Sequence, residues 1–171
     1  DIIRLSRLDE GVRGEATPVD LTALIQHCVQ KLTPAAQNAQ VSISASGNDP
    51  VLISGDHALL EEMLTNLLEN GIKYNHAGGY VRARAEMADG RAVVTVADNG
   101  VGIAPEDQQR VFERFYRVDK SRSKQTGGTG LGLSIVKHGA QVHHAQIAMQ
   151  SALGEGTTIT LTFPAQSSGK K

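Results

Sequence analysis

Hydrophobic residues recur at helical spacing in three stretches of the chain. The first follows Asp20 and covers residues 21–32, the second follows Asp56 and runs to about Tyr74, and the third covers residues 131–144. Apolar residues every three or four positions form one buried stripe on a helix, and an aspartate just before such a stripe is a favourable N-cap. We therefore predict three long helices, the first two capped by their aspartates.

Most other apolar positions alternate with polar ones or form short β-branched runs, which is typical of strands. The expected extended segments are residues 17–19, 41–45, 51–53, 80–87, 91–97, 146–151 and 157–163. Residues 98–132 are rich in loop-forming residues, with one short helix expected around residues 106–115. Together these elements predict a two-layer α/β sandwich, in which a mixed, mostly antiparallel sheet carries three long helices on one face.

Composition and charge narrow the class of protein. The chain has 171 residues, 40% of them hydrophobic, which suits one globular domain with a sizeable core. A formal net charge of -1 gives no electrostatic reason to bind nucleic acid or an anionic membrane. A single cysteine, Cys28, excludes an internal disulfide and a cysteine-based zinc cluster. Because Cys28 lies within the apolar stripe of the first helix, we expect a buried, unreactive thiol.

The second helix presents two chemically different faces. One face carries the apolar stripe, and the opposite face carries Glu62, Asn66, Asn70 and Lys73. A solvated face is the simplest interpretation, but asparagine is a poor helix former and two of them lie one turn apart. Carboxamide oxygens at this spacing can coordinate a hard cation, and a lysine one turn further can meet phosphate oxygens. Both interpretations stay open at this point.

Two glycine-rich stretches follow. Asp98 ends a strand just before Gly100 and Gly102, where a carboxylate could accept a hydrogen bond from a flat ligand, although a plain turn has the same pattern. The other stretch, residues 127–133, leads into the third helix and predicts an anion site at its N-terminus. Between them lies a basic segment that we interpret as a lid over phosphates. Its basic residues are Arg114, Arg117, Lys120, Arg122 and Lys124.

Five of these segments, in this order, resemble the sequence boxes of bacterial sensor histidine kinases. They are NLLENGIKY at residues 66–74, DNGVGI at 98–103, FERFYR at 112–117, GTGLGL at 128–133 and GEGTT at 154–158. The resemblance extends over about residues 17–164, and the stretch FYRVDKSRSKQTGGTGLGLSIVKHG is similar to the phosphate-sensing kinases of Gram-positive bacteria.

The resemblance implies a division of the chain. Residues 1–13 would be the end of the second dimerisation-domain helix, residues 14–164 the catalytic ATP-binding domain, and residues 165–171 a disordered tail. It also implies the Bergerat fold, which agrees with the sandwich predicted from the elements.

The same resemblance implies ATP and Mg²⁺ as ligands and assigns residues to the phosphate end of the site. Asn70 would hold Mg²⁺ with help from Asn66, while Lys73 and Arg117 would lie near phosphates. Backbone amides of the second glycine box would contact the phosphates. The residues concerned are Gly128, Thr129, Gly130, Leu131, Gly132 and Leu133.

At the base end, Asp98 would accept a hydrogen bond from the adenine amino group. Gly102 and Ile103 would lie beside the base, after Gly100 in the same box. Tyr74 would line the pocket, and Thr158 would support the adenine through water.

The resemblance also implies partners that this chain lacks. None of the six histidines stands in a phosphoacceptor context, so the acceptor would lie on a separate dimerisation domain of the same kinase. We expect a monomeric fragment of a homodimeric, membrane-anchored parent, facing the cytoplasm and passing the phosphoryl group to a response regulator. The sequence departs from the family at His143-His144-Ala145, where a glycine pair is usual, so the turn geometry there is open.

A second hypothesis is an ATP-driven clamp or ATPase of the same superfold. Those relatives generally have a glutamate at the position of Asn66, where it activates water. Asparagine cannot act as a general base at neutral pH, so Asn66 favours phosphotransfer over hydrolysis.

Overall fold

The computed structural model describes residues 16–108, 110–113 and 132–165. The three predicted helices are present as α2 (Leu21–Ala39), α3 (His57–Lys73) and α5 (Gly132–Val142). Asp20 accepts hydrogen bonds from the Thr22 and Ala23 amides, and Asp56 accepts one from the Leu59 amide. Both predicted N-caps are therefore confirmed.

The strands form two sheets. A small antiparallel sheet pairs β1 (Thr17–Asp20) with β3 (Leu52–Gly55). The main sheet has five strands in the order β2-β4-β5-β7-β6. Its bounds are β2 (Ser42–Ser46), β4 (Tyr80–Ala88), β5 (Arg91–Asp98), β6 (Gln146–Ala152) and β7 (Gly156–Thr162). The β2–β4 pair is parallel and the other three pairs are antiparallel, so the sheet is mixed and mostly antiparallel as predicted.

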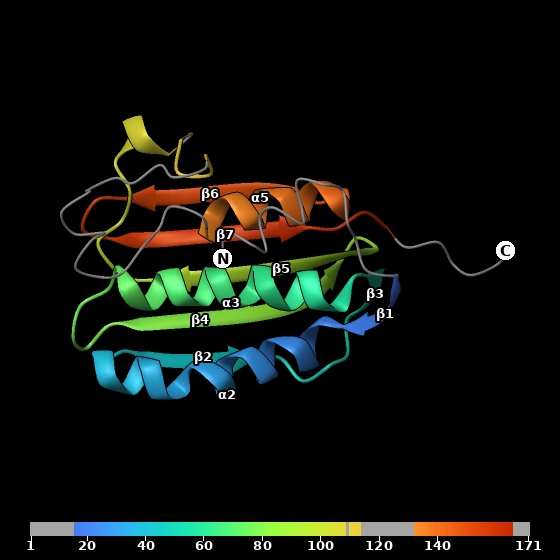
Figure 1. Cartoon of the computed structure of the whole chain (residues 1–171), viewed down its shortest axis with the longest axis horizontal. Helices are drawn as coiled ribbons and strands as arrows, with labels where there is room; N and C mark the ends of the chain where they lie inside the picture. The colour runs from blue at the N-terminus through green and yellow to red at the C-terminus, as the bar shows by residue number, and fades with distance from the viewer. Residues whose placement is uncertain (1–15, 109, 114–131, 166–171) are drawn as a thin grey trace, which may run out of the picture.

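The helices α2, α3 and α5 lie side by side on one face of the main sheet (Figure 1). Between helices and sheet lies a single apolar core, in which α3 is central because it contacts α2 on one side and α5 on the other. The eight buried residues of α3 are Leu59, Leu60, Met63, Leu64, Leu67, Leu68, Gly71 and Ile72. The predicted two-layer α/β sandwich is confirmed.

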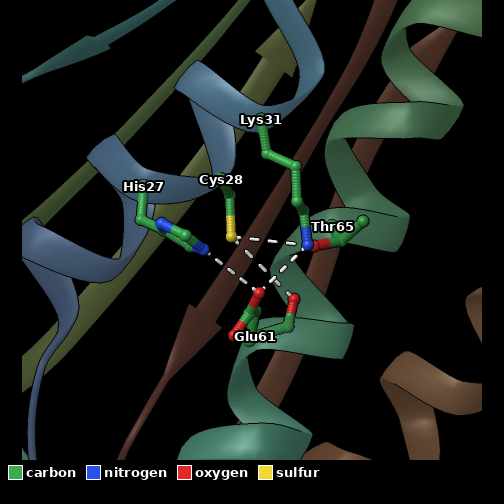
Figure 2. Close-up of polar contacts among 5 residues, drawn as sticks. All are labelled: His27, Cys28, Lys31, Glu61 and Thr65. Carbon is green, nitrogen blue, oxygen red and sulfur yellow. Dashed lines mark hydrogen bonds and ion pairs between the residues drawn. The ribbon is translucent and has the colours of Figure 1, made fainter.

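Cys28 lies at the contact between α2 and α3 and is fully buried, as its place in the apolar stripe predicts (Figure 2). The Thr65 hydroxyl donates a hydrogen bond to its sulfur at 3.6 Å. Burial raises the pKa of the Cys28 thiol, which disfavours the reactive thiolate. At the exposed edge of the same contact, Glu61 of α3 accepts from Lys31 of α2.

The structure corrects the short helix expected around residues 106–115. In the described part of this stretch, Pro105–Asp107 form a 3-10 turn, η1, and residues 110–113 form turns. Proline fits the first position of a helix, but only one buried apolar residue, Val111, follows before the described segment ends. Within the described residues, so little apolar surface is available to bury that propensity alone does not form an α-helix.

The turn at His143-His144 forms without glycine. His144 adopts a left-handed backbone with φ of 57°, a conformation that costs energy for a residue with a Cβ. His143 Nε2 accepts the Asp56 amide at 3.0 Å, while Nδ1 lies 2.8 Å from the Gly139 carbonyl. These contacts require the neutral ring with its proton on Nδ1, and they tie the end of α5 to the start of α3.

None of the described helices is both long and apolar enough to cross a membrane.

Candidate functional site

The polar face of α3 is arranged as the sequence predicts. Asn66 and Asn70 are half-buried and Lys73 is exposed, on the side of the helix opposite the core residues. Asn66 Nδ2 is buried and has no hydrogen-bond partner among the described residues. A buried amide donor without an acceptor carries a desolvation cost of about 1–3 kcal/mol. Such an orphaned donor fits a site whose ligand supplies the acceptor, as a phosphate oxygen would.

The end of α3 is joined to the loop that follows β5. The Val101 amide donates to the Tyr74 carbonyl at 2.9 Å, directly after the last turn of the helix. Asn99 Oδ1 accepts the Tyr80 amide at 2.7 Å, and Asn75 Nδ2 donates to the Tyr80 carbonyl at 3.0 Å. The end of α3, the end of β5 and the start of β7 therefore meet at the same end of the molecule (Figure 1, left). The structure thus brings the asparagine helix and the first glycine box together.

Asp98 is the carboxylate at this end of the sheet. Its Oδ1 accepts two backbone amides, from Gly100 at 2.9 Å and from Thr157 at 3.3 Å. Its Oδ2 has no hydrogen-bond partner among the described residues, and no lysine or arginine among them forms an ion pair with Asp98. Burial raises the pKa of Asp98, and the two amide hydrogen bonds oppose that rise only in part. The arrangement holds one oxygen rigidly and leaves the other to accept from a ligand.

The loop after Asp98 depends on glycine at two positions. Gly102 has φ of 76°, and a Cβ there would overlap the Ala152 carbonyl at the end of β6. Gly100 is buried, and a Cβ there would overlap the Tyr74 carbonyl at the end of α3. Both positions require glycine because this loop passes close to the end of α3 and to the end of β6. The same close approach places the half-buried Ile103 against β6.

Thr157, which the sequence interpretation overlooked, is joined directly to Asp98. Thr157 lies opposite Asp98 in the pairing of β5 with β7, and its amide donates to the carboxylate. The predicted residue, Thr158, lies opposite Ala97, and strand alternation places its side chain on the other face of the sheet. The role assigned to Thr158 stays a prediction, but this register favours Thr157 as the residue on the Asp98 side.

Ser151 and Gln108 also went unnoticed in the sequence. Their side chains hydrogen-bond to the backbone of Ile103. A serine in an alternating strand and a glutamine after a turn carry no distinctive pattern, so only the fold reveals them.

Part of the predicted phosphate end lies outside the described residues. This applies to Arg117, Gly128, Thr129, Gly130 and Leu131. Gly132 is the first residue of α5, and Leu133 is half-buried against the core. Within the described residues, no group of three or more histidine, cysteine or acidic side chains could hold a metal ion.

A family model described as "Histidine kinase-, DNA gyrase B-, and HSP90-like ATPase" matches residues 55–167. The chain is 42% identical over 165 residues to the sensor-like histidine kinase SenX3 of Mycolicibacterium smegmatis, covering 96% of this chain and 43% of that protein. It is 39% identical over 171 residues to the phosphate regulon sensor protein PhoR of Pseudomonas aeruginosa, covering 97% of this chain and 38% of that protein. The chain thus spans about two fifths of the length of these relatives.

Among solved structures, full-length ShkA in complex with AMPPNP superposes with a TM-score of 0.82 at 28% identity. The match covers 97% of this chain and 35% of that one. The family model, the relatives and the shared fold agree on the family of this chain. The chain belongs to the histidine kinase-, DNA gyrase B- and HSP90-like ATPase family, and within it is the ATP-binding catalytic domain of a sensor histidine kinase.

Proposed function

We propose that this domain binds Mg-ATP where α3, β5 and β7 meet and donates the γ-phosphoryl group to a histidine. The acceptor histidine would lie on a dimerisation domain of the same kinase, and a response regulator would receive the phosphoryl group next. The parent kinase would be a membrane-anchored homodimer with this domain on its cytoplasmic side.

The observation that carries the proposal is the state of Asp98. Asp98 is half-buried, yet among the described residues only its Oδ1 accepts hydrogen bonds, and no cation lies beside it. The adenine amino group is a donor that could complete Oδ2. Guanine has a carbonyl oxygen at that position, and two facing acceptors would leave a mismatch of about 1–3 kcal/mol.

The polar face of α3 would serve the phosphates. Asn70 Oδ1 is suited to a hard cation such as Mg²⁺, which neutralises the phosphate charge during transfer. The unpaired Asn66 Nδ2 and the exposed Lys73 ammonium are donors suited to phosphate oxygens. Arg117 is predicted to act on the terminal phosphate.

Binding is tested by titration calorimetry of the chain with a non-hydrolysable ATP analogue and its GTP counterpart, with and without Mg²⁺. We expect binding of the ATP analogue that strengthens with Mg²⁺, and much weaker binding of the GTP analogue. Asn70→Ala should remove most of the Mg²⁺ effect. Glu69→Ala, one residue away on the same helix, is the matched control and should bind normally. Equal affinity for the two analogues would contradict the role of Asp98.

Transfer is tested with ATP labelled on the γ-phosphoryl group. The chain alone should release phosphate slowly and should not label itself on histidine. Adding a dimerisation domain that carries the acceptor histidine should give an acid-labile phosphohistidine on that domain, limited by the low effective concentration of two separate chains. Rapid hydrolysis without transfer would instead support the clamp or ATPase hypothesis.

A further inference from the structure

The peptide unit around Ile103 is held by two side chains from different parts of the chain. The Ile103 amide donates to Ser151 Oγ at 2.8 Å. The Ile103 carbonyl accepts from Gln108 Nε2 at 2.9 Å, and the same nitrogen donates to the Ser151 carbonyl at 3.1 Å. Ile103, Gln108 and Ser151 therefore form a closed set of hydrogen bonds, which we call the Ile103 clasp.

The Ser151 hydroxyl also reaches the strand that carries Thr157. It donates to the Gly156 carbonyl at 2.9 Å and lies 2.8 Å from Thr157 Oγ1. A hydroxyl has one proton, so when Ser151 donates to Gly156 the proton between the two hydroxyls must come from Thr157. Ser151 thereby uses its donor and two acceptor sites, all on described residues.

These contacts connect both sides of Asp98. On one side, Thr157 is fixed by Ser151 through its hydroxyl and holds Asp98 Oδ1 through its amide. On the other side, Ser151 fixes Ile103, which ends the loop that begins at Asp98. A serine that merely closed the β6–β7 hairpin would need only the Gly156 contact. The bond to Ile103, 48 residues away, has no such local purpose.

Building on the proposed function, we infer that Ser151 is a positioning residue for purine selection, supported by Gln108. Ser151 does not contact the base. It fixes the distance between the Asp98 carboxylate and the Ile103 backbone, between which the edge of the purine would fit. Loss of the hydroxyl should therefore lower the ratio of ATP to GTP affinity while the domain still folds.

The clasp itself is tested without nucleotide, by amide hydrogen exchange of the full chain. In Ser151→Ala the Ile103 amide loses its acceptor, and we expect its exchange to accelerate roughly 5–10-fold, the factor that one net hydrogen bond corresponds to. Gln150→Ala, on the exposed neighbouring position of β6, should leave Ile103 exchange unchanged. Ser151→Thr keeps the hydroxyl and should restore slow exchange. An unchanged Ile103 amide in Ser151→Ala would overturn the inference.

Selectivity is tested by the ratio of affinities for the ATP and GTP analogues. We expect Ser151→Ala to lower this ratio roughly 5–10-fold, with restoration in Ser151→Thr and no change in Gln150→Ala. Gln108→Ala, which removes only the second half of the clasp, should lower the ratio less and provides a variant outside the sheet if Ser151→Ala does not fold.

The two proposals fail in different ways. If the wild-type chain binds neither analogue, the proposed function is wrong, and the role of Ser151 in purine selection is wrong as well. If the wild-type chain prefers the ATP analogue and both Ser151→Ala and Gln108→Ala keep that preference, the proposed function stands and only the positioning role is overturned.

Discussion

Two carboxylates on this domain have opposite surroundings. Glu61, at the α2–α3 contact, faces two side chains that can carry positive charge, with Oε2 at 3.0 Å from Lys31 Nζ and 3.3 Å from His27 Nε2 (Figure 2). Asp98, at the end of β5, is held only by backbone amides among the described residues. The Lys31 hydrogen bond lowers the pKa of Glu61, whereas burial raises the pKa of Asp98.

The contrast separates a carboxylate that is already paired with side chains from one that keeps an oxygen for the ligand we propose. Glu61 is already paired with Lys31, so it has little to offer a ligand. Asp98 is half-buried with no cation beside it among the described residues, so a donor on a ligand can recover part of the cost of its desolvation. The partners of Glu61 are flexible side chains. The partners of Asp98 are backbone amides, so its position depends on the path of the backbone.

The largest effect is expected from disturbing that backbone path. Gly102→Ala would force a left-handed alanine against the Ala152 carbonyl, and we expect a loss of about 2–5 kcal/mol in the free energy of unfolding. Gly90→Ala is the matched control, because Gly90 has φ of 78° but nothing within 4 Å of an added Cβ. It should cost only about 1–2 kcal/mol. Urea unfolding measures both, and equal losses would show that the contact with β6 is unimportant.

The next effect concerns the free oxygen of Asp98. Asp98→Asn keeps an acceptor for the Gly100 and Thr157 amides but places a donor where the adenine amino group would bind. We expect ATP affinity to fall by about 1–3 kcal/mol, with a relative gain for GTP, whose carbonyl could accept from the new amide. Glu61→Gln makes the same chemical change at the other carboxylate and should leave nucleotide affinity unaltered. Calorimetry that gave both variants wild-type affinity would remove Asp98 from the site.

The two carboxylates should also respond to pH with opposite signs. The folded-state pKa of Asp98 is raised, so the native state binds its proton more tightly, and the stability from this group falls as pH rises from the ordinary aspartate range through the raised pKa. The folded-state pKa of Glu61 is lowered, so its stabilisation is present above the ordinary glutamate pKa and is lost as pH falls through the lowered value. Unfolding of wild type, Asp98→Asn and Glu61→Gln across this range separates the two contributions.

Nucleotide selection gives a second readout of the Asp98 titration. Because ATP and GTP carry the same phosphates, the ratio of their affinities cancels the protonation of the triphosphate. We expect this ratio to fall as pH drops through the raised Asp98 pKa, since a protonated carboxyl can donate to the guanine carbonyl. The ratio in Asp98→Asn should be insensitive to pH over the same range.

The smallest effect belongs to the Glu61 ion pair. Lys31 is 42% and Glu61 28% exposed, so solvent screens their attraction. Glu61→Gln should cost about 0.2–1 kcal/mol of unfolding free energy, and the cost should shrink in high salt. A larger, salt-independent loss would mean that Glu61 contributes through packing instead.

Local rules were sufficient to predict most of the fold. The stripe on α3 and the caps at Asp20 and Asp56 depend on residues within a few positions of each other, so their periodicity is readable from the sequence. The same periodicity placed Asn66, Asn70 and Lys73 together on the face away from the core, as the structure has them.

Long-range pairing decided what the sequence could not reveal. Whether Thr157 or Thr158 lies on the Asp98 side depends on the register between β5 and β7, and a shift of one residue reverses the face. The clasp of Ile103 by Ser151 joins residues that only the folded sheet brings together. The left-handed His144 was unexpected because its cost is offset by tertiary contacts, and the structure shows those contacts at the neighbouring His143.

The position of β7 has a consequence for how the domain is made on the ribosome. Among the described strands β7 is translated last, yet it inserts between β5 and β6 and brings Thr157 to Asp98. Until β7 has been synthesised, β5 has one unpaired edge, and unpaired strand edges are prone to aggregation. A chain that stopped before Gly156 would leave β5 and β6 without their pairing to β7 and would lack the Thr157 amide that holds Asp98. Pairing of β7 would therefore complete the middle of the main sheet and the support of Asp98 in one step of folding.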